Sequence, residues 1–195
     1  MAHRRLILAS GSPRRRELLA DAGYDFAVIS PAVSEVQFAY FSLREITLAN
    51  AFRKGRAVSR LHSASVVLAA DTLVALDGEV IGKPRDLEHA QEILRALSGR
   101  THEVCSAVFV GCETLARERL FHVVSRVRFR ALTDAAIAEY FAKIDPLDKA
   151  GAYAAQDDAG KVIAEIDGSF TNVVGLPIEE TAAVLREFAV EPRRD

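Results

Sequence analysis

The feature of this sequence that most clearly predicts chemistry is a short apolar run that ends in Ser10-Gly11-Ser12-Pro13 and continues into three arginines. Pro13 suits the first turn of a helix, because its fixed φ fits there and no amide donor is lost, and Ser12 can cap that helix. Cations at a helix N-terminus are unfavourable on dipole grounds. A bound anion would offset that cost, so we expect a phosphate site here. The alternative is that the arginines point to solvent.

Asp71 is the second candidate, because it follows the apolar run Val66–Ala70, where a strand would fix a carboxylate at the edge of a sheet. Lys83 returns toward it after Asp77-Gly78, the strongest hairpin signal in the chain. A two-residue loop pairs Thr72 with Lys83 and leaves Asp71 on the other face. A loop one residue longer puts Asp71 and Lys83 on the same face. Either register keeps both groups in one neighbourhood, and an Asp that only begins a turn is the alternative.

Several other polar side chains could join such a site. Glu35 lies in an irregular segment and could bind a metal or activate water, although an exposed loop carboxylate is the simpler interpretation. Lys54 taken alone is typical of the solvated face of a helix. Gln156 lies in a loop among small residues, and its amide could read the edge of a base, the alternative being a plain surface loop. His102 more simply begins a strand.

Together these groups fit phosphate chemistry, in which a divalent cation held by Asp71 and Glu35 neutralises charge and positions water for in-line attack. The sequence has no nucleophile–base pair like Ser-His-Asp and no Walker motif, which disfavours a kinase or a motor ATPase. No cysteine or histidine spacing predicts zinc. Cys105 and Cys112 are seven residues apart, which places them on opposite faces of a continuous strand, so we do not expect them to pair.

The composition is that of an ordinary globular protein, with 50% apolar and 27% charged residues among 195. The formal net charge of −2 gives no global basic field, so we expect no stable complex with nucleic acid. No apolar run reaches the length of a signal peptide or of a membrane span. These observations predict a cytoplasmic protein that does not enter a membrane.

Hydrophobic periodicity predicts the elements that must position these side chains. We expect strands over residues 6–9, 24–30, 65–70, 72–76, 79–81, 102–112 and 120–132, and a second hairpin over 162–166 and 170–174. Helices are expected over 13–21, 43–61, 87–97 and 133–143, and from 177 onward. Leu48, Ala51 and Phe52 would form the apolar side of the second helix. Strands and helices do not alternate strictly, so we predict an α/β fold with a mixed, twisted sheet flanked by helices. One domain would span 1–190, and a loose tail 191–195.

The motifs taken together resemble those of the Maf family of nucleoside triphosphate pyrophosphatases. The resemblance covers nearly the whole chain and rests on segments in the same order, namely Ala9–Arg15, Ala70–Val74, Gly82–Pro84, Leu97–His102, Pro146–Tyr153 and Asn172–Pro177. It implies a house-cleaning hydrolase that converts a nucleoside triphosphate into the monophosphate and pyrophosphate with Mg²⁺, Mn²⁺ or Co²⁺. It also implies a Maf/ITPase-like fold of two lobes around a deep cleft, and a chain that could form a homodimer.

The resemblance also assigns roles by position. Asp71 matches the proton acceptor, and Arg14, Thr72 and Gln156 match the positions that set substrate specificity. Further matches to polar residues of the cleft are Arg15, Glu35, Lys54 and Lys83. We therefore predict that Asp71, Glu35 and Lys83 are catalytic and that Asp71 and Glu35 hold the metal. The substrate would be bound by Ser10, Ser12, Arg14, Arg15, Lys54, Thr72 and Gln156, with Arg16 as a solvated neighbour.

The segment Asp148–Gln156 resembles the branch of the family that acts on dTTP and UTP, more than the branch that acts on 7-methyl-GTP. The sequence reads Tyr-Ala-Ala-Gln-Asp from Tyr153 to Asp157, where Tyr-Gly-Ile-Gln-Gly is common. Asp157 adds a negative charge beside the expected base pocket, so the sequence leaves the choice of pyrimidine open. Modified pyrimidine triphosphates are a further predicted class of substrate. The alternatives are a pyrophosphatase for 7-methyl-GTP or another purine nucleotide, and a nucleotide-binding regulator of cell division.

Overall fold

The computed structural model describes residues 4–36, 40–157 and 160–193. A seven-stranded mixed sheet with the order β2-β1-β3-β5-β6-β7 forms its centre, and β4 pairs with β3. The strands are β1 (Leu6–Leu8), β2 (Phe26–Val28), β3 (Val66–Leu76), β4 (Glu79–Ile81), β5 (Thr101–Cys112), β6 (Arg117–Phe129) and β7 (Ile163–Asp167). The helices are α1 (Pro13–Asp21), α2 (Leu43–Ser59), α3 (Leu87–Leu97), α4 (Asp134–Phe141), α5 (Phe170–Val174) and α6 (Ile178–Glu187). The predicted mixed sheet flanked by helices is confirmed.

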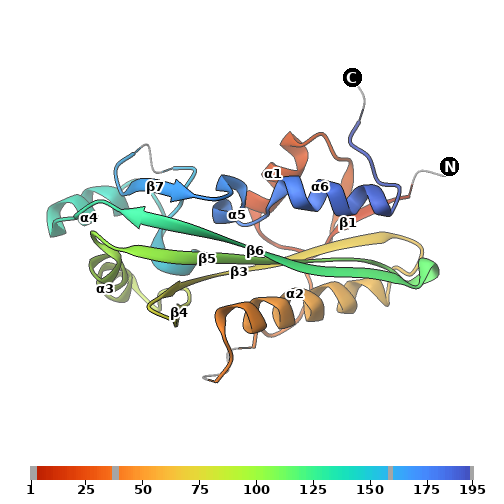
Figure 1. Cartoon of the computed structure of the whole chain (residues 1–195), viewed down its shortest axis with the longest axis horizontal. Coiled ribbons are helices and arrows are strands. Elements are labelled where there is room, and N and C mark those ends of the chain that lie inside the picture. The colour runs from red at the N-terminus through yellow and green to blue at the C-terminus, as the bar shows by residue number, and fades with distance from the viewer. Residues whose placement is uncertain (1–3, 37–39, 158–159, 194–195) are drawn as a thin grey trace.

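The helices cover both faces of the three long strands. Figure 1 shows α2 along one side of β3, β5 and β6, with α1, α5 and α6 along the other side. Alternate residues of β3 follow this division. The odd-numbered Leu73 and Ala75 pack against α2, whereas the even-numbered side chains belong to two other clusters. Because side chains of a strand alternate between faces, β3 presents different surroundings to each neighbouring residue.

The even-numbered face of β3 divides the core into two lobes. Val66 and Leu68 pack in one cluster with side chains of α1 and α6. Val74 and Leu76 pack in a second cluster with side chains of α3 and α4. Thr72 lies between the two on the same face of the strand. A polar residue in the middle of this strand thus marks the boundary between the lobes.

The edge of β3 that faces β1 changes partner partway along. β1 runs parallel to β3 and pairs with it as far as Leu68, whereas β4 runs antiparallel and pairs with it from Val74 onward. Between these two positions no described strand pairs with that edge of β3. The opposite edge is paired continuously with β5 from Val67 to Ala75. The backbone of β3 is therefore held by β5 along one edge, while no described strand pairs with its other edge at Asp71 and Thr72.

Several sequence expectations agree with the structure. The helices expected over 13–21 and 87–97 have these bounds, and the side chain of Asp86 caps the second of them. Asp77 and Gly78 have φ angles of 52° and 85°, as a two-residue turn of a hairpin requires. Cys105 and Cys112 are both free and lie in different clusters, so they do not pair.

Two elements differ from the prediction by more than a few residues at their ends. The strand expected to end before Asp71 continues to Leu76, because β5 pairs with it along its length. The second half of the expected hairpin, 170–174, is the helix α5. Its apolar residues resemble a strand, but Gly168 at φ 114° turns the chain and the side chain of Ser169 caps the new helix.

The buried face of α2 is also not the one expected. Ala51 is fully buried as predicted, but Phe52 is 38% exposed and Leu48 is only partly buried. The face against the sheet instead contains Ile46, Thr47 and Asn50. Two polar residues therefore lie where a hydrophobic stripe alone would place apolar ones.

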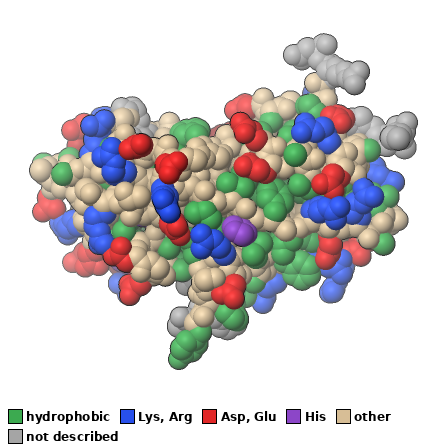
Figure 2. Space-filling model, in the orientation of Figure 1, with side chains coloured by type: hydrophobic (Ala, Val, Ile, Leu, Met, Phe, Trp, Pro, Cys, Tyr) green, Lys and Arg blue, Asp and Glu red, His purple; other side chains and the backbone are tan. Residues whose placement is uncertain are grey.

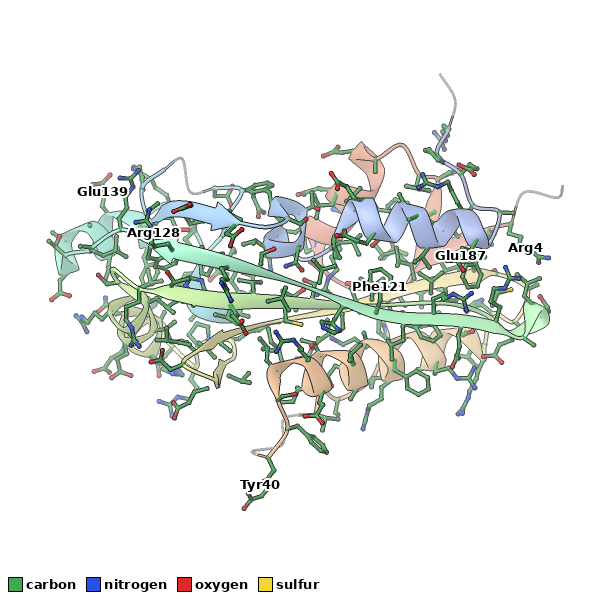
Figure 3. The ribbon with its side chains drawn as sticks, viewed as in Figure 1. Arg4, Tyr40, Phe121, Arg128, Glu139 and Glu187 are labelled. Carbon is green, nitrogen blue, oxygen red and sulfur yellow. The ribbon has the colours of Figure 1, made fainter. Side chains whose placement is uncertain are left out.

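The outer surface carries charges of both signs. β6 alternates buried Val127 and Phe129 with exposed Arg128, which Figure 3 labels. Arg128 forms an ion pair with Glu165 of β7. Lys and Arg side chains are interspersed with Asp and Glu side chains across the face drawn in Figure 2. Among the helices of the described residues, none combines the length and the apolar character needed to cross a membrane. In the tail predicted to be loose, the Arg193 N–H donates to the Gly23 carbonyl at 2.8 Å.

Candidate active site

A cavity of about 250 Å³ opens at the unpaired edge of β3. It is lined by nine of the ten side chains predicted for the site, namely Ser12, Arg14, Arg15, Glu35, Lys54, Asp71, Thr72, Lys83 and Gln156. The tenth, Ser10, lines a second cavity of about 320 Å³ that shares several of these residues. Residues far apart in the sequence thus meet where the sheet lacks a strand.

An ion cluster occupies the α2 side of this edge. Lys54 Nζ donates to Glu35 Oε1 at 2.6 Å and to Asp71 Oδ1 at 2.7 Å. The Asp71 side chain is 5% exposed and that of Lys54 is 12% exposed. The sequence context of Lys54, taken alone, predicted a solvated helix face, and that prediction is wrong. The face of α2 that contains Lys54 packs on the sheet, so its ammonium group bridges two carboxylates.

Glu35 remains ionised in this environment. Burial raises its pKa, but the hydrogen bond and charge of Lys54, with the charges of Lys83 and Arg15, outweigh that effect and lower the pKa below its usual value. The side chain is 45% exposed, so water also reaches it. Glu35 is thus a partly exposed loop carboxylate that forms an ion pair with Lys54. Its role in binding a metal or activating water stays a prediction.

Arg15 lies on the face of β3 opposite to Asp71 and donates hydrogen bonds to three separate segments. Its Nε donates to the Gly175 carbonyl at 2.8 Å, its Nη1 to Ser10 Oγ at 3.2 Å and its Nη2 to Thr72 Oγ1 at 3.0 Å. Burial lowers the pKa of Arg15, while the charge of Asp71 raises it. A guanidinium has five N–H donors, so these contacts leave two for another ligand.

Arg14 pairs with a residue that the sequence prediction did not include in the site. Its Nη1 donates to Asp148 Oδ2 at 3.1 Å. Asp148 also accepts from Lys149 Nζ at 2.5 Å. Burial raises the pKa of Asp148, but Lys149 and Arg14 outweigh it and lower the pKa. Asp148 lies within the segment Pro146–Tyr153 that carried the family resemblance, so the sequence could have indicated this residue. Nothing in the sequence indicated that Asp148 pairs with Arg14 across the cleft.

The Ser-Gly-Ser turn is held differently from the prediction. Ser12 occupies the N-cap position of α1, but its side chain makes no capping hydrogen bond. Ser10 Oγ instead accepts from the Ser12 N–H at 3.2 Å. The first amides of α1 are therefore not capped by Ser12. They belong to a helix end that carries partial positive charge. Arg16 is exposed, as expected of a solvated neighbour.

The hairpin register settles how Asp71 and Lys83 are related. Leu76 pairs with Glu79 and Val74 with Ile81, which is the two-residue loop. Continued at the same spacing, this register puts Lys83 opposite Thr72 and leaves Asp71 on the other face. Lys83 is exposed and makes no hydrogen bond or ion pair with the described residues. Both it and Asp71 line the cavity, because the cavity opens at the strand edge where both faces are accessible.

Neutral and aromatic contacts support the part of the cavity wall that contains Tyr153, Ala154 and Gln156. The backbone of Ala154, two residues before Gln156, is bonded twice to the buried Tyr140. The Tyr140 hydroxyl donates to the Ala154 carbonyl at 3.2 Å and accepts from its N–H at 3.0 Å. His102 Nε2 lies 2.9 Å from the Tyr153 hydroxyl, and both rings pack edge-on against Phe129. Burial lowers the pKa of His102 to about 4. His102 lies within β5, as predicted.

The donor set of the cavity suits a hard divalent cation. Asp71 and Glu35 supply carboxylate oxygens, which Mg²⁺ prefers, and Mg²⁺ is commonly held by one or two carboxylates together with water and substrate phosphates. In the described parts of the chain, no group of three or more His, Cys, Asp or Glu side chains is arranged to hold a metal by itself. The two carboxylates therefore fit a cation that arrives with an anionic ligand.

Comparison with known proteins gives matches over nearly the whole chain. The family model described as Maf-like protein matches residues 5–188. A protein named dTTP/UTP pyrophosphatase from Escherichia coli strain K12 is 46% identical over 192 residues, covering 97% of this chain and 96% of the relative. Relatives of the same name from Akkermansia muciniphila and Bacillus cytotoxicus are 44% and 41% identical. These two alignments cover 92% and 95% of this chain and 94% and 96% of the relatives.

Proposed function

Because the chain belongs to the family of Maf-like proteins, we propose that it is a hydrolase that converts dTTP and UTP into the monophosphate and pyrophosphate. The observation that carries this proposal is the cavity at the open edge of β3, which arginines, lysines and carboxylates line together. The names of the relatives support the pyrimidine substrates, and they give no support to the purine-directed alternative.

The triphosphate would occupy the end of the cleft nearest α1. Its charge would be met by the first amides of α1, the hydroxyls of Ser10 and Ser12, and the remaining donors of Arg15. Arg14 would exchange Asp148 for a phosphate oxygen, since both are anionic partners of the same guanidinium. Lys83, which has no ion-pair partner among the described residues, would bind the triphosphate from the side of the β3–β4 hairpin.

Asp71 would accept the proton of the water that attacks the triphosphate. That step breaks the anhydride between the α and β phosphates and releases pyrophosphate, while the proton passes to a carboxylate oxygen of Asp71. Its low exposure and its contact with Lys54 keep the group oriented toward the cavity. A divalent cation held by Asp71 and Glu35 would neutralise charge on the phosphates.

The base would lie at the neutral end of the cleft, where Gln156 can both donate and accept hydrogen bonds. The loop that presents Gln156 is held by Tyr140 through Ala154. Asp157 is exposed next to it and would disfavour further negative charge on the base. Modified pyrimidine triphosphates belong in the same test as dTTP and UTP.

The proposal is tested by a panel of nucleoside triphosphates with Mg²⁺, Mn²⁺ and Co²⁺, scored by pyrophosphate release. We expect turnover of dTTP and UTP, and a loss of about 10²- to 10⁴-fold in kcat for Asp71→Asn, with nucleotide binding largely kept. The matched control is the distant Asp77→Asn. Purine turnover without dTTP or UTP turnover would favour the purine alternative. Tight nucleotide binding without turnover would favour a regulator.

The cytoplasmic location and the homodimer stay predictions. Both cysteines are free and buried, which suits a reducing compartment. Sedimentation of the purified protein across a range of concentrations measures the assembly state directly.

A further inference from the structure

Asn50 is a buried polar residue next to the charged cluster that the sequence did not single out. It lies on α2 one turn before Lys54, and only 3% of it is exposed. A carboxamide buried in this way is costly unless its donors and acceptor find partners. The identity of those partners therefore indicates what the residue does.

Both N–H donors and the carbonyl oxygen of the Asn50 amide have partners. Its Oδ1 accepts from the Val36 N–H at 2.7 Å. Its Nδ2 donates to the Val36 carbonyl at 3.2 Å and to Asp71 Oδ2 at 3.2 Å. The opposite orientation of the amide would place its NH₂ group against the Val36 N–H and its oxygen against a carboxylate. The partners thus fix which side of the amide is nitrogen.

These contacts divide the Asp71 carboxylate between two donors of one helix. Oδ2 accepts from Asn50, and Oδ1 accepts from Lys54 four residues later. Residues four apart lie on the same face of a helix, so both donors reach the carboxylate from α2. The carboxylate cannot rotate without breaking one of the two bonds. Each oxygen keeps a further lone pair for another ligand.

The same amide also holds the segment that carries Glu35. The paired bonds to the N–H and carbonyl of Val36 resemble the pairing between two strands, although residue 36 belongs to no strand. Lys54 then binds the adjacent Glu35 side chain. Asn50 and Lys54 together connect α2, the segment at residues 35–36 and β3 at one point.

We propose that Asn50 is a positioning residue, which orients Asp71 for proton acceptance and places Glu35 beside it. This inference rests on the proposed function, in which Asp71 accepts the proton of water. Reacting groups must be held within about 0.5 Å of their productive positions, and a misplacement of about 1 Å can cost 10²-fold in rate. A residue that holds the Asp71 carboxylate and also the backbone next to Glu35 is therefore expected to affect kcat more than substrate binding.

The test compares two substitutions of Asn50 with a matched control on the same helix. Asn50→Leu removes all three bonds, whereas Asn50→Asp keeps the acceptor for the Val36 N–H and removes both donors. The control is Thr47→Val, because Thr47 is also buried and polar but donates to the Leu43 carbonyl and does not contact Asp71. Each kcat is measured at a temperature where the variant is fully folded by its melting curve.

For Asn50→Leu and Asn50→Asp we expect kcat for dTTP to fall about 10- to 100-fold, with KM changed by less than about threefold. Thr47→Val should lower the melting temperature and leave kcat within about twofold. A kcat loss in Asn50→Leu no larger than in Thr47→Val overturns the proposal, as does a loss that appears entirely in KM.

Amide hydrogen exchange at Val36 gives a readout that does not depend on activity. Exchange should accelerate in Asn50→Leu and remain slow in Asn50→Asp, because only the second variant keeps an acceptor for that N–H. Unchanged exchange in Asn50→Leu overturns the placement of the 35–36 segment by Asn50. A wild-type protein that hydrolyses no nucleotide overturns the proposed function and the role of Asp71. The exchange result does not depend on activity, so it still shows whether Asn50 holds the segment at residues 35–36.

Discussion

The two ends of the cleft are held by different interactions. At the α2 end, Lys54 bridges Glu35 and Asp71 through short ion pairs. At the opposite end, Tyr140 and His102 hold the loop before Gln156 through neutral hydrogen bonds inside an apolar cluster. At the charged end, phosphates and a cation can replace the present ion-pair partners. At the neutral end, the hydrogen-bonded groups are uncharged and buried, so a charged ligand does not displace them.

This difference predicts different consequences of mutation. Ion pairs that are partly buried contribute little net stability, because desolvation offsets much of their attraction. Hydrogen bonds to buried backbone groups cost more when they are lost, since the group left behind has no partner. Changes at the charged end should therefore affect turnover first, and changes at the neutral end should affect stability and substrate binding first.

Among the variants that compare the two ends of the cleft, the largest effect is expected for Lys54→Met. The variant removes the cation between Glu35 and Asp71, so the two carboxylates repel each other and Asp71 loses one of its two donors. We expect kcat to fall by about 10²-fold or more. Steady-state kinetics with dTTP measure it, with Arg53→Met as the control, because Arg53 is an exposed cation on the same helix. If Arg53→Met lowered kcat as much as Lys54→Met, the position of Lys54 between the two carboxylates would not explain the loss.

A pH-dependent effect on stability is expected from His102. Its pKa is about 4 in the folded protein and about 6.5 when unfolded, so the unfolded chain binds more protons between these values. The contribution to the free energy of unfolding is therefore complete above about pH 6.5 and is lost as the pH falls toward 4. The loss is at most about 3 kcal/mol.

Urea denaturation between pH 7 and pH 4 measures this dependence. Carboxylates titrate in the same range, so the wild-type slope must be compared with that of His102→Asn, which does not titrate. The wild type should lose more stability than the variant over this range. Parallel slopes would mean that His102 does not contribute in this way.

The smallest of these effects is expected for Tyr140→Phe. The substitution leaves the Ala154 N–H and carbonyl without the hydroxyl that pairs with both, which should cost about 1 to 3 kcal/mol in unfolding free energy. KM for dTTP should rise by about threefold or more, with kcat within about twofold. Tyr40→Phe is the control, because Tyr40 is 98% exposed and projects away from the body (Figure 3). A fall in kcat with unchanged KM would contradict the comparison.

Local signals in the sequence were sufficient for much of the fold. Pro13 fixed the beginning of α1 and Asp86 that of α3, because both act within one helical turn. Asp77-Gly78 determined the two-residue hairpin, since few other residues accept positive φ at both positions. The helix α5 was missed because its apolar residues also suit a strand, and the capping side chain of Ser169 decides between the two.

Residue types and the order of the motifs predicted ten side chains for the site, and nine of them line one cavity. They did not point to Asp148 or Asn50. The partners of these side chains depend on the assembled fold. Lys54 bridges two carboxylates, Asp148 holds Arg14, and Asn50 holds Asp71. These pairs join residues up to 134 positions apart, and the spacing of residues along a chain carries no information about contacts across an open sheet edge. The gap between β1 and β4 along β3 exists only in the assembled sheet, and it is the reason that both faces of one strand meet in a single cleft.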